Sequence, residues 1–236
     1  MLRSYAMTED RQISIALPTI RRLPMYVAVL EKALQDGQTH ASSSQIAGAL
    51  GLESIQVRKD LAAVGVVGQP GVGFPVGELI AAIEKSLGWD NASDAFVIGA
   101  GHLGTALAGY RGFARYGLNI VALFDSDPAK VGQTVHGKKI LPMEKFADLV
   151  ARLHVRIAIL TVPAEAATES AALAAEAGIK ALWNFTPTKL APIDGVIVER
   201  VDLAASLAVL SSRLASLVGA SGATRAQAAD EPESEV

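Results

Sequence analysis

The feature that most constrains this chain is Phe96-Val97-Ile98-Gly99-Ala100-Gly101-His102-Leu103-Gly104, an apolar strand pattern followed by G-x-G-x-x-G and then a helical pattern. In that context the first glycine permits a tight turn, the second lets a pyrophosphate approach the backbone, and the third lets the helix pack close to the strand. The N-terminus of the helix presents N–H groups and a positive dipole end to phosphate. The pattern fits a dinucleotide site, and it fits a glycine turn in another α/β protein equally well.

Composition narrows the classes of protein that fit this motif. The chain has 236 residues, half of them hydrophobic, which suits one large or two small domains. The net charge of −3 means that any nucleic-acid surface must be local, and the absence of Cys excludes disulfides and Cys-ligated zinc. The sequence has neither a membrane-spanning run nor a signal-peptide pattern, so we expect a cytoplasmic protein.

The N-terminal part predicts three short helices after a flexible lead-in at residues 1–16. The second and third are joined by a tight turn at Gly51, which is the helix-turn-helix arrangement. We expect Ile55, Val57, Leu61 and Val64 on the inward face of the third helix. The residues expected to start or stop the three helices are Thr19, Gly37, Ser42 to Ser44, Gly51 and Ser54.

The third helix is a candidate recognition helix because Gln56, Arg58 and Lys59 are expected on its exposed side, where groove and phosphate contacts form. Two short apolar segments around a Gly/Pro turn at residues 65–74 predict a β-hairpin, the wing of a winged helix. A small helical cap with a solvated charged face is the alternative. The first 75 residues carry seven basic and six acidic side chains, so this part of the chain lacks the strong excess of positive charge that is typical of DNA-binding domains.

From residue 95 the pattern changes to alternating strands and helices, which is typical of a parallel sheet with crossover helices. A polar stretch at residues 88–94 reads as the domain boundary. The expected strands are 95–98, 119–124, 139–141, 156–162, 180–185 and 196–198, and the expected helices are 77–87, 103–114, 143–153 and 164–177.

Asp125 follows the second strand, where a Rossmann domain holds a carboxylate against the adenosine ribose hydroxyls. A carboxylate there favours NAD(H), because it would repel a 2′-phosphate; a turn in Asp-Ser-Asp-Pro is the alternative reading. The carboxyl ends of parallel strands bind ligands, which makes a further set of residues candidate neighbours of the nicotinamide: Thr161, Val162, Pro163, Asn184 and Phe185.

The last predicted helix, residues 202–217, carries an apolar stripe that includes Leu203, Leu207, Leu210 and Leu214. It can pack on its own domain or dock on a partner subunit, and the sequence leaves both open. Residues 219–236 are rich in Ala, Ser and acidic side chains and are expected to be disordered.

A dehydrogenase needs an acid–base group beside the hydride acceptor. None of the four histidines, His40, His102, His136 and His154, is predicted there, and Tyr110 and Lys189 form no recognisable pair. The cofactor is therefore expected to act as a signal. An NAD-dependent oxidoreductase with a helical dimerisation domain is the competing reading, and a DNA-binding protein whose dinucleotide site has lost its ligand is a third.

Several motifs, in this order, resemble the Rex family of redox-sensing transcriptional repressors over about residues 17–217. They are Arg21-Arg22-Leu23-Pro24-Met25-Tyr26, Gln56-Val57-Arg58-Lys59-Asp60-Leu61, Gly71-Val72-Gly73-Phe74, GAGHLG at 99–104, FDSDPAKVG at 124–132, TVPAEAA at 161–167, NFTP at 184–187 and Val201-Asp202-Leu203.

The resemblance implies a homodimer that binds operator DNA with NAD⁺ or no cofactor and releases it with NADH, and that is not an enzyme. It implies a winged-helix domain at 17–88, a Rossmann-like parallel-sheet domain at 89–201 and a domain-swapped C-terminal helix at 202–218. The resemblance also implies three groups of site residues.

The residues expected at the cofactor are Gly99, Ala100, Gly101, His102, Leu103, Gly104, Tyr110, Asp125, Thr161, Val162, Pro163, Asn184 and Phe185. Those expected at DNA are Ser43, Ser54, Gln56, Arg58, Lys59, Gly71 and Gly73. Those expected between subunits or domains are Asp202, Leu203, Leu207, Leu210 and Leu214.

Three departures from the family pattern bear on DNA affinity and switching. Ala62-Ala63-Val64-Gly65 stands where the family usually has Ser-Tyr-Phe-Gly or similar. Gln69-Pro70 stands at the tip of the wing, where the family usually has a basic residue. The missing charge should weaken contact with DNA phosphates and make DNA binding depend less on salt concentration. Ala28 stands where an arginine often pairs with the aspartate at the Asp202 position.

Overall fold

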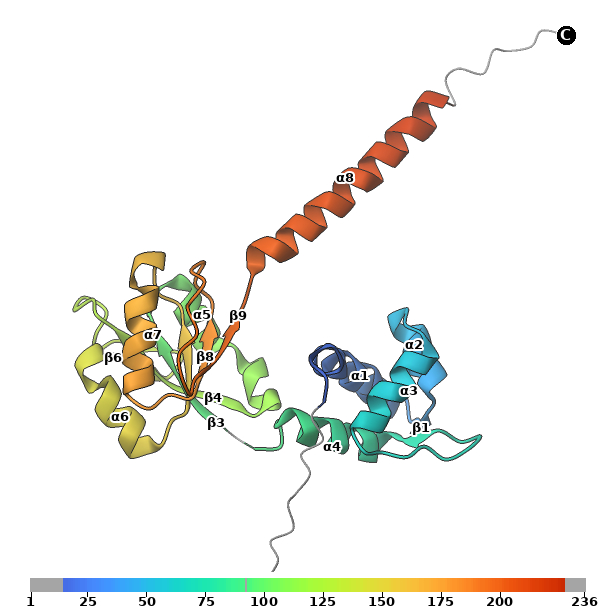
Figure 1. Cartoon of the computed structure of the whole chain (residues 1–236), viewed down its shortest axis with the longest axis horizontal. Helices are drawn as coiled ribbons and strands as arrows, with labels where there is room; N and C mark the ends of the chain where they lie inside the picture. The colour runs from blue at the N-terminus through green and yellow to red at the C-terminus, as the bar shows by residue number, and fades with distance from the viewer. Residues whose placement is uncertain (1–14, 92, 228–236) are drawn as a thin grey trace, which may run out of the picture. The chain divides into compact units, whose positions relative to one another are not determined.

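The protein is described by a computed structural model over residues 15–91 and 93–227, with only the backbone described beyond residue 218 (Figure 1). Its chain divides into two compact units. Unit 1 contains residues 1–92 together with 111–118, and unit 2 contains residues 93–110 together with 119–236. The chain therefore passes between the units three times, whereas the sequence predicted one boundary at residues 88–94.

Unit 1 is a helical domain with a small two-stranded sheet. Its helices are α1 (Leu17–Gln35), α2 (Ser43–Leu50), α3 (Ser54–Ala63) and α4 (Val76–Leu87), and β1 (His40–Ala41) pairs antiparallel with β2 (Phe74–Pro75). The core is built from apolar side chains that are fully buried at helical spacing. They include Leu23, Tyr26, Leu30, Ile46, Val57, Leu61, Leu79 and Ile83. Burial of these faces is what holds such short helices in place.

The starts of the three predicted helices test the local sequence rules. Of the three serines predicted as possible caps, Ser42 caps α2: its hydroxyl accepts the Gln45 N–H and the Gln45 side chain accepts the Ser42 N–H, which is a capping box. Thr19 does not cap α1, because the helix already begins at Leu17 and the Thr19 hydroxyl bonds Asp60 instead. The prediction for Ser54 is also wrong, since Glu53 precedes α3 and Ser54 is its first residue.

The wing is less regular than a β-hairpin. Only one bridge, between Gln69 and Gly73, joins its two sides. The second apolar segment pairs with β1 instead, a strand that the sequence did not reveal. Gly73 allows this pairing: its φ is +105°, and a Cβ there would lie 2.6 Å from the Ala41 carbonyl oxygen. A side chain at this position would separate the two strands.

The predicted helix 103–114 ends early. Helix α5 spans His102–Gly109, and the chain continues as a 3-10 helix, η1 (Arg111–Tyr116), which belongs to unit 1. There the Tyr116 ring lies 4.5 Å from the Trp89 ring, and Arg115 forms an ion pair with Glu31 of α1. Packing within unit 1 thus overrides the helical pattern after Gly109.

Unit 2 is a seven-stranded sheet with the order β5-β6-β4-β3-β7-β8-β9. Its strands are β3 (Ser93–Ile98), β4 (Leu118–Asp125), β5 (Thr134–Val135), β6 (Lys138–Pro142), β7 (Ile157–Leu160), β8 (Ala181–Asn184) and β9 (Ile197–Arg200). β4–β6, β3–β7, β7–β8 and β8–β9 pair in parallel, and β5 is antiparallel to β6. Without the antiparallel β5 at its edge, this is the doubly wound order of dinucleotide-binding domains.

The crossovers of unit 2 are α5, η2 (Met143–Lys145) with α6 (Phe146–Leu153), and η3 (Ala164–Ala166) with α7 (Ala167–Glu176). The core is aromatic at its centre, where the Phe96, Phe124 and Phe146 rings pack edge to face at 4.8–5.9 Å. The central strands are buried on both faces, which explains their continuous apolar sequence.

The last helix, α8 (Leu203–Gln227), extends away from the sheet of unit 2 (Figure 1). Every described side chain from Leu203 to Val218 is exposed. The helix also continues through residues 219–227, a stretch for which the sequence predicts disorder. Residues 1–14 of the expected lead-in at 1–16 and residues 228–236 of the expected tail at 219–236 lie outside the described residues.

Candidate functional site

A cleft of about 700 Å³ opens at the carboxyl ends of β3 and β7, where the strand order reverses. Open α/β sheets bind ligands at this switch point. Its lining combines apolar side chains with a few polar groups, as small-molecule sites do. The lining residues are Ile98, Gly99, Gly101, Phe124, Asp125, Ser126, Asp127, Lys130, Met143, Thr161, Val162, Pro163, Ala166, Glu169, Ser170 and Leu173.

The three glycines of the motif differ in what surrounds them. Gly99 has φ +101°, and a Cβ there would lie 2.9 Å from the Thr161 backbone. A Cβ on Gly104 would overlap the Gly99 carbonyl oxygen and lie 2.7 Å from Thr161 Oγ1. Around Gly101, no atom of the described residues beyond its own chain neighbours lies within 4 Å of such a Cβ. Gly99 and Gly104 thus serve packing, and only Gly101 leaves open space for a ligand.

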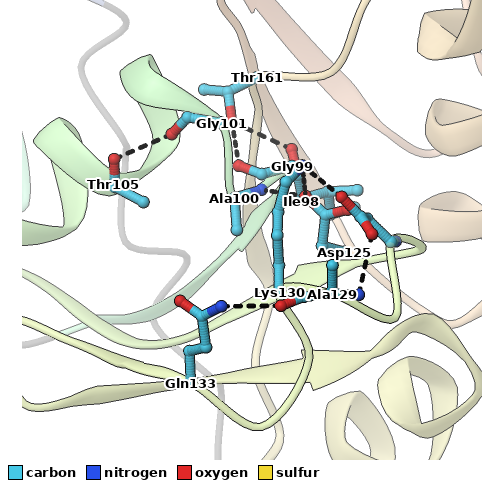
Figure 2. Close-up of polar contacts among 11 residues, drawn as sticks. Ile98, Gly99, Ala100, Gly101, Thr105, Asp125, Ala129, Lys130, Gln133 and Thr161 are labelled. Carbon is cyan, nitrogen blue, oxygen red and sulfur yellow. Dashed lines mark hydrogen bonds and ion pairs between the residues drawn. The ribbon is translucent and has the colours of Figure 1, made fainter.

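Thr161 fastens the two strand ends together at this point (Figure 2). Its hydroxyl lies 2.7 Å from the Gly99 carbonyl oxygen and 3.1 Å from that of Ile98. No side chain of the described residues caps α5, whose N-cap residue is Gly101. The first-turn N–H groups of α5 are therefore available for phosphate oxygens, which is what a dinucleotide requires.

Asp125 already has partners within the protein (Figure 2). Its carboxylate accepts the Ala100 N–H at 2.7 Å, the Asp127 N–H at 2.9 Å and the Lys130 ammonium at 3.1 Å. Burial alone would raise the pKa of Asp125, but these three donors outweigh burial and lower it. The group is therefore an anion at neutral pH, and Lys130 partly offsets its charge.

Lys130 is one of several cleft residues that sequence reasoning missed, along with Met143, Glu169, Ser170 and Leu173. The signal for Lys130 was present, since it lies five residues after Asp125 in the same turn and binds it. Nothing in the sequence pointed to Glu169, Ser170 and Leu173 of α7, because these residues reach the cleft only through the way the crossover helix packs on the sheet.

Seven predicted cofactor residues are not among the cleft-lining residues. Ala100 and Gly104 are buried, while His102, Leu103 and Tyr110 are exposed. Asn184 is fully buried and holds its own loop, accepting the Thr186 N–H and hydroxyl and donating to the Thr188 carbonyl oxygen. Phe185 packs its ring edge-on against Trp183 at 4.9 Å.

A second hollow, of about 610 Å³, lies in unit 1 between α3, the start of α2 and the wing. Arg58 lines it together with Gly71 and Gly73, and Lys59 is exposed on the next position of α3. Ser43 also contributes to the lining, but its side chain is only 7% exposed and has little surface for DNA. Ser54 and Gln56 are partly exposed, and Ile55, predicted inward, is 62% exposed.

The recognition helix is fixed to α1 through Asp60, which the sequence did not single out as a site residue. The Asp60 carboxylate is 2% exposed and accepts two bonds from Arg22, at 2.7 and 2.9 Å, and one from the Tyr26 hydroxyl at 2.6 Å. Thr19 and Gln56 donate two more, at 2.9 and 3.0 Å. Burial would raise the pKa of Asp60, but these donors, Arg22 foremost, bring it down to about 2.

Asp202 sits at the start of α8. Its carboxylate accepts the Ala205 N–H at 2.9 Å and pairs with Arg200. The four leucines predicted at an interface, Leu203, Leu207, Leu210 and Leu214, are 57–64% exposed.

In the part of the chain that the structure describes, no helix is long and apolar enough to span a membrane, and no cluster of His, Asp or Glu could hold a metal ion.

A helix-turn-helix unit followed by a sheet with a dinucleotide-type cleft defines a class: DNA-binding regulators that respond to a small molecule. Residues 14–62 match the family model "Putative DNA-binding protein N-terminus", and residues 90–188 match the model named CoA binding domain.

The chain belongs to the Rex family of redox-sensing transcriptional repressors. It is 49% identical to the Rex repressor of Treponema denticola over 83% of this chain and 93% of that protein, and 44% identical to that of Carboxydothermus hydrogenoformans over 82% and 93%. The crystal structure of RSP with β-NAD⁺ and operator DNA is 34% identical and superposes with a TM-score of 0.81 over 92% of this chain and 99% of that one. RSP with β-NADH is 36% identical and gives 0.77 over 85% and 94%. The family consists of repressors, so the oxidoreductase alternative is wrong.

Proposed function

We propose that this protein represses transcription by binding operator DNA with NAD⁺ or without cofactor, and that NADH releases it. The observation that carries the proposal is one chain holding both a cleft at the switch point of unit 2 and a helix α3 with exposed Arg58 and Lys59 in unit 1. The relatives' recorded ligands, NAD⁺, NADH and operator DNA, support this assignment.

NAD(H) fits the residues of the cleft. The open space at Gly101 and the uncapped start of α5 suit the pyrophosphate, and the anionic Asp125 suits ribose hydroxyls. Thr161, Val162 and Pro163, at the end of β7, are the proposed neighbours of the nicotinamide. When bound, the cofactor supplies a ring that is cationic when oxidised and neutral when reduced. An apolar wall at Val162 disfavours the cation, so we expect tighter binding of NADH.

Coupling between the two functions is supported by the path of the chain. Helix α5 begins at the cleft, and the segment after it, residues 111–118, is part of the DNA-binding unit and pairs with α1 through Arg115 and Glu31. A ligand that repositions α5 therefore acts on unit 1 through a short covalent connection. We propose that this changes the spacing of the two DNA-binding units in a dimer, which must match two operator half-sites.

We further propose that the dimer forms through α8. Seven apolar side chains on this helix are 54–67% exposed, more than a surface helix of a monomer ordinarily shows. The leucines at 203, 207, 210 and 214 recur at spacings of three or four, so they form a stripe that a partner subunit can bury. Such a repressor would act on DNA in the cytoplasm.

The test is the affinity of the full chain for a labelled palindromic duplex, measured by fluorescence anisotropy with NAD⁺, NADH or CoA. We expect NADH to weaken binding by roughly 5- to 150-fold relative to NAD⁺, the usual range of coupling between two sites. CoA, which also contains an adenosine diphosphate, should have no such effect. Equal affinity with NAD⁺ and NADH would refute the sensing function while leaving DNA binding intact.

A further inference from the structure

The first turn of α3 carries a glutamine whose orientation is set by a buried carboxylate. Gln56 Nε2 donates to Asp60 Oδ1 at 3.0 Å, one helical turn along the same helix. Gln56 is the third residue of α3. In helix-turn-helix proteins the N-terminal residues of the recognition helix contact the base edges, so this side chain is at a reading position.

The Asp60 carboxylate fixes the orientation of the Gln56 amide. Asp60 is ionised at neutral pH and can only accept hydrogen bonds, so the NH₂ group and not the carbonyl oxygen of Gln56 must bond it. Arg22, Tyr26 and Thr19 hold the carboxylate in place from α1. One amide hydrogen of Gln56 is used, and the second hydrogen and Oε1 remain as an adjacent donor and acceptor.

That pair matches one base in the major groove. Adenine offers an N6 donor beside an N7 acceptor, whereas guanine offers two acceptors, cytosine a donor and thymine an acceptor with a methyl group. We propose that Gln56 reads an adenine in each operator half-site and that Asp60 is the positioning residue that orients its amide for this contact. The inference rests on the proposed operator binding and names the base that α3 selects.

Ile55 supports an A·T preference independently. It is 62% exposed at the second position of α3 and next to Gln56, although the neighbouring Val57 is fully buried. An apolar side chain at the start of a recognition helix is suited to contact the C5-methyl group of thymine. The two residues would thus read adjacent A·T pairs by different chemistry.

The experiment begins with selection of bound duplexes from a randomised pool by the full-length protein with NAD⁺. The same selection is repeated with Gln56→Ala and with Gln35→Ala, an exposed glutamine at the end of α1 as the matched control. We expect wild type and Gln35→Ala to share one motif. Gln56→Ala should lose a single adenine, symmetrically in both half-sites, while the other positions stay. If Gln56→Ala retains every adenine of the motif, the inference is wrong.

Base analogues in the selected duplex test the same contact with the unmodified protein. Replacing that adenine by 7-deazaadenine removes the N7 acceptor, one of the two hydrogen bonds of the bidentate contact, and should weaken wild-type binding by up to roughly 150-fold. Gln56→Ala should bind both duplexes equally. Replacing the neighbouring thymine by uracil should affect wild type but not Ile55→Ala. If wild type shows no loss at any adenine carrying the analogue, Gln56 does not read adenine.

Asp60→Asn tests the positioning role. Asparagine can donate as well as accept, so the Gln56 amide is free to reverse, and adenine preference should fall although Gln56 is present. Far-ultraviolet circular dichroism tests whether this variant is folded, and the analogue measurement on wild type decides the base contact whatever the result for the variant. If wild type selects no sequence at all, the proposed operator binding itself has failed, which is a different outcome from an unchanged motif.

Discussion

Arg22 of α1 and Asp60 of α3 form a two-pronged ion pair, with Nε–Oδ2 and Nη2–Oδ1 distances of 2.7 and 2.9 Å. The carboxylate is almost completely buried, so its loss leaves Arg22 and Tyr26 without their acceptor. We expect Asp60→Ala to lower the free energy of unfolding by about 3–5 kcal/mol, as for other broken buried pairs. Urea denaturation measures this. Asp36→Asn, at an exposed position of the same unit, should change it by less than about 0.5 kcal/mol, and similar losses in both variants would contradict the assignment.

The same carboxylate predicts how stability depends on pH. The folded state holds the pKa of Asp60 at about 2, against 3.8 for an ordinary aspartate. Its contribution is complete above pH 4 and disappears as the pH falls from 4 to 2, amounting to about 2 kcal/mol. The pKa of Tyr26 is raised to about 12, chiefly by burial and then by its bond to Asp60, so stability is also lost between pH 10 and 12.

The free energy of unfolding, measured at a series of pH values, tests both losses of stability. Asp60→Asn should reduce the loss between pH 4 and 2, and Tyr26→Phe should reduce the loss between pH 10 and 12. If Asp60→Asn loses as much stability in acid as the wild type does, other carboxylates cause the acid dependence.

Single alanines at the motif glycines should separate packing from ligand binding. Gly101→Ala places its methyl group in open space, so the free energy of unfolding should stay within about 1 kcal/mol while NADH affinity falls by about tenfold or more. Gly104→Ala places its methyl group on the Gly99 carbonyl, so it should destabilise the fold itself. Intrinsic fluorescence in urea and NADH fluorescence titration measure the two effects. If Gly101→Ala binds NADH with unchanged affinity, the pyrophosphate does not bind at Gly101.

Asp125 and Lys130 should decide between NADH and NADPH. The carboxylate repels a 2′-phosphate and accepts ribose hydroxyls, so Asp125→Ala should weaken NADH binding and narrow its advantage over NADPH. Lys130→Ala removes the ammonium 3.1 Å from Asp125 and should widen that advantage, because the negative charge is no longer offset. Parallel titrations with the two nucleotides test this. If both variants move the ratio in the same direction, the charge argument fails.

The exposed face of α8 predicts the oligomeric state. Leu210→Glu puts a charge into the apolar stripe and should convert a dimer to a monomer in sedimentation equilibrium. The thermal stability of the monomer should be little affected, because Leu210 is 64% exposed. Ser211→Glu, at the next position, is the matched control and should remain dimeric. A dimer that survives Leu210→Glu would place the interface elsewhere.

The amino-acid sequence by itself determined the class of both units. The glycine spacing at 99–104 and the apolar strand runs predicted the parallel sheet and its cleft, because these patterns reflect local backbone needs and burial on both faces. The capping box at Ser42 was readable for the same reason: all of its atoms lie within four consecutive residues. Local chemistry of this kind is written in short stretches of sequence.

Only the tertiary structure decided which residues met across the chain. Thr19 reads as a helix cap, yet its hydroxyl is used by Asp60, forty-one residues away. Ile55 fits an inward pattern but lies outside, and residues 111–118 leave the helix of unit 2 to pack in unit 1. For Thr19 and for residues 111–118, a long-range partner outweighed a local preference of about 1 kcal/mol or less, since burial and buried hydrogen bonds are worth more than capping or helix propensity.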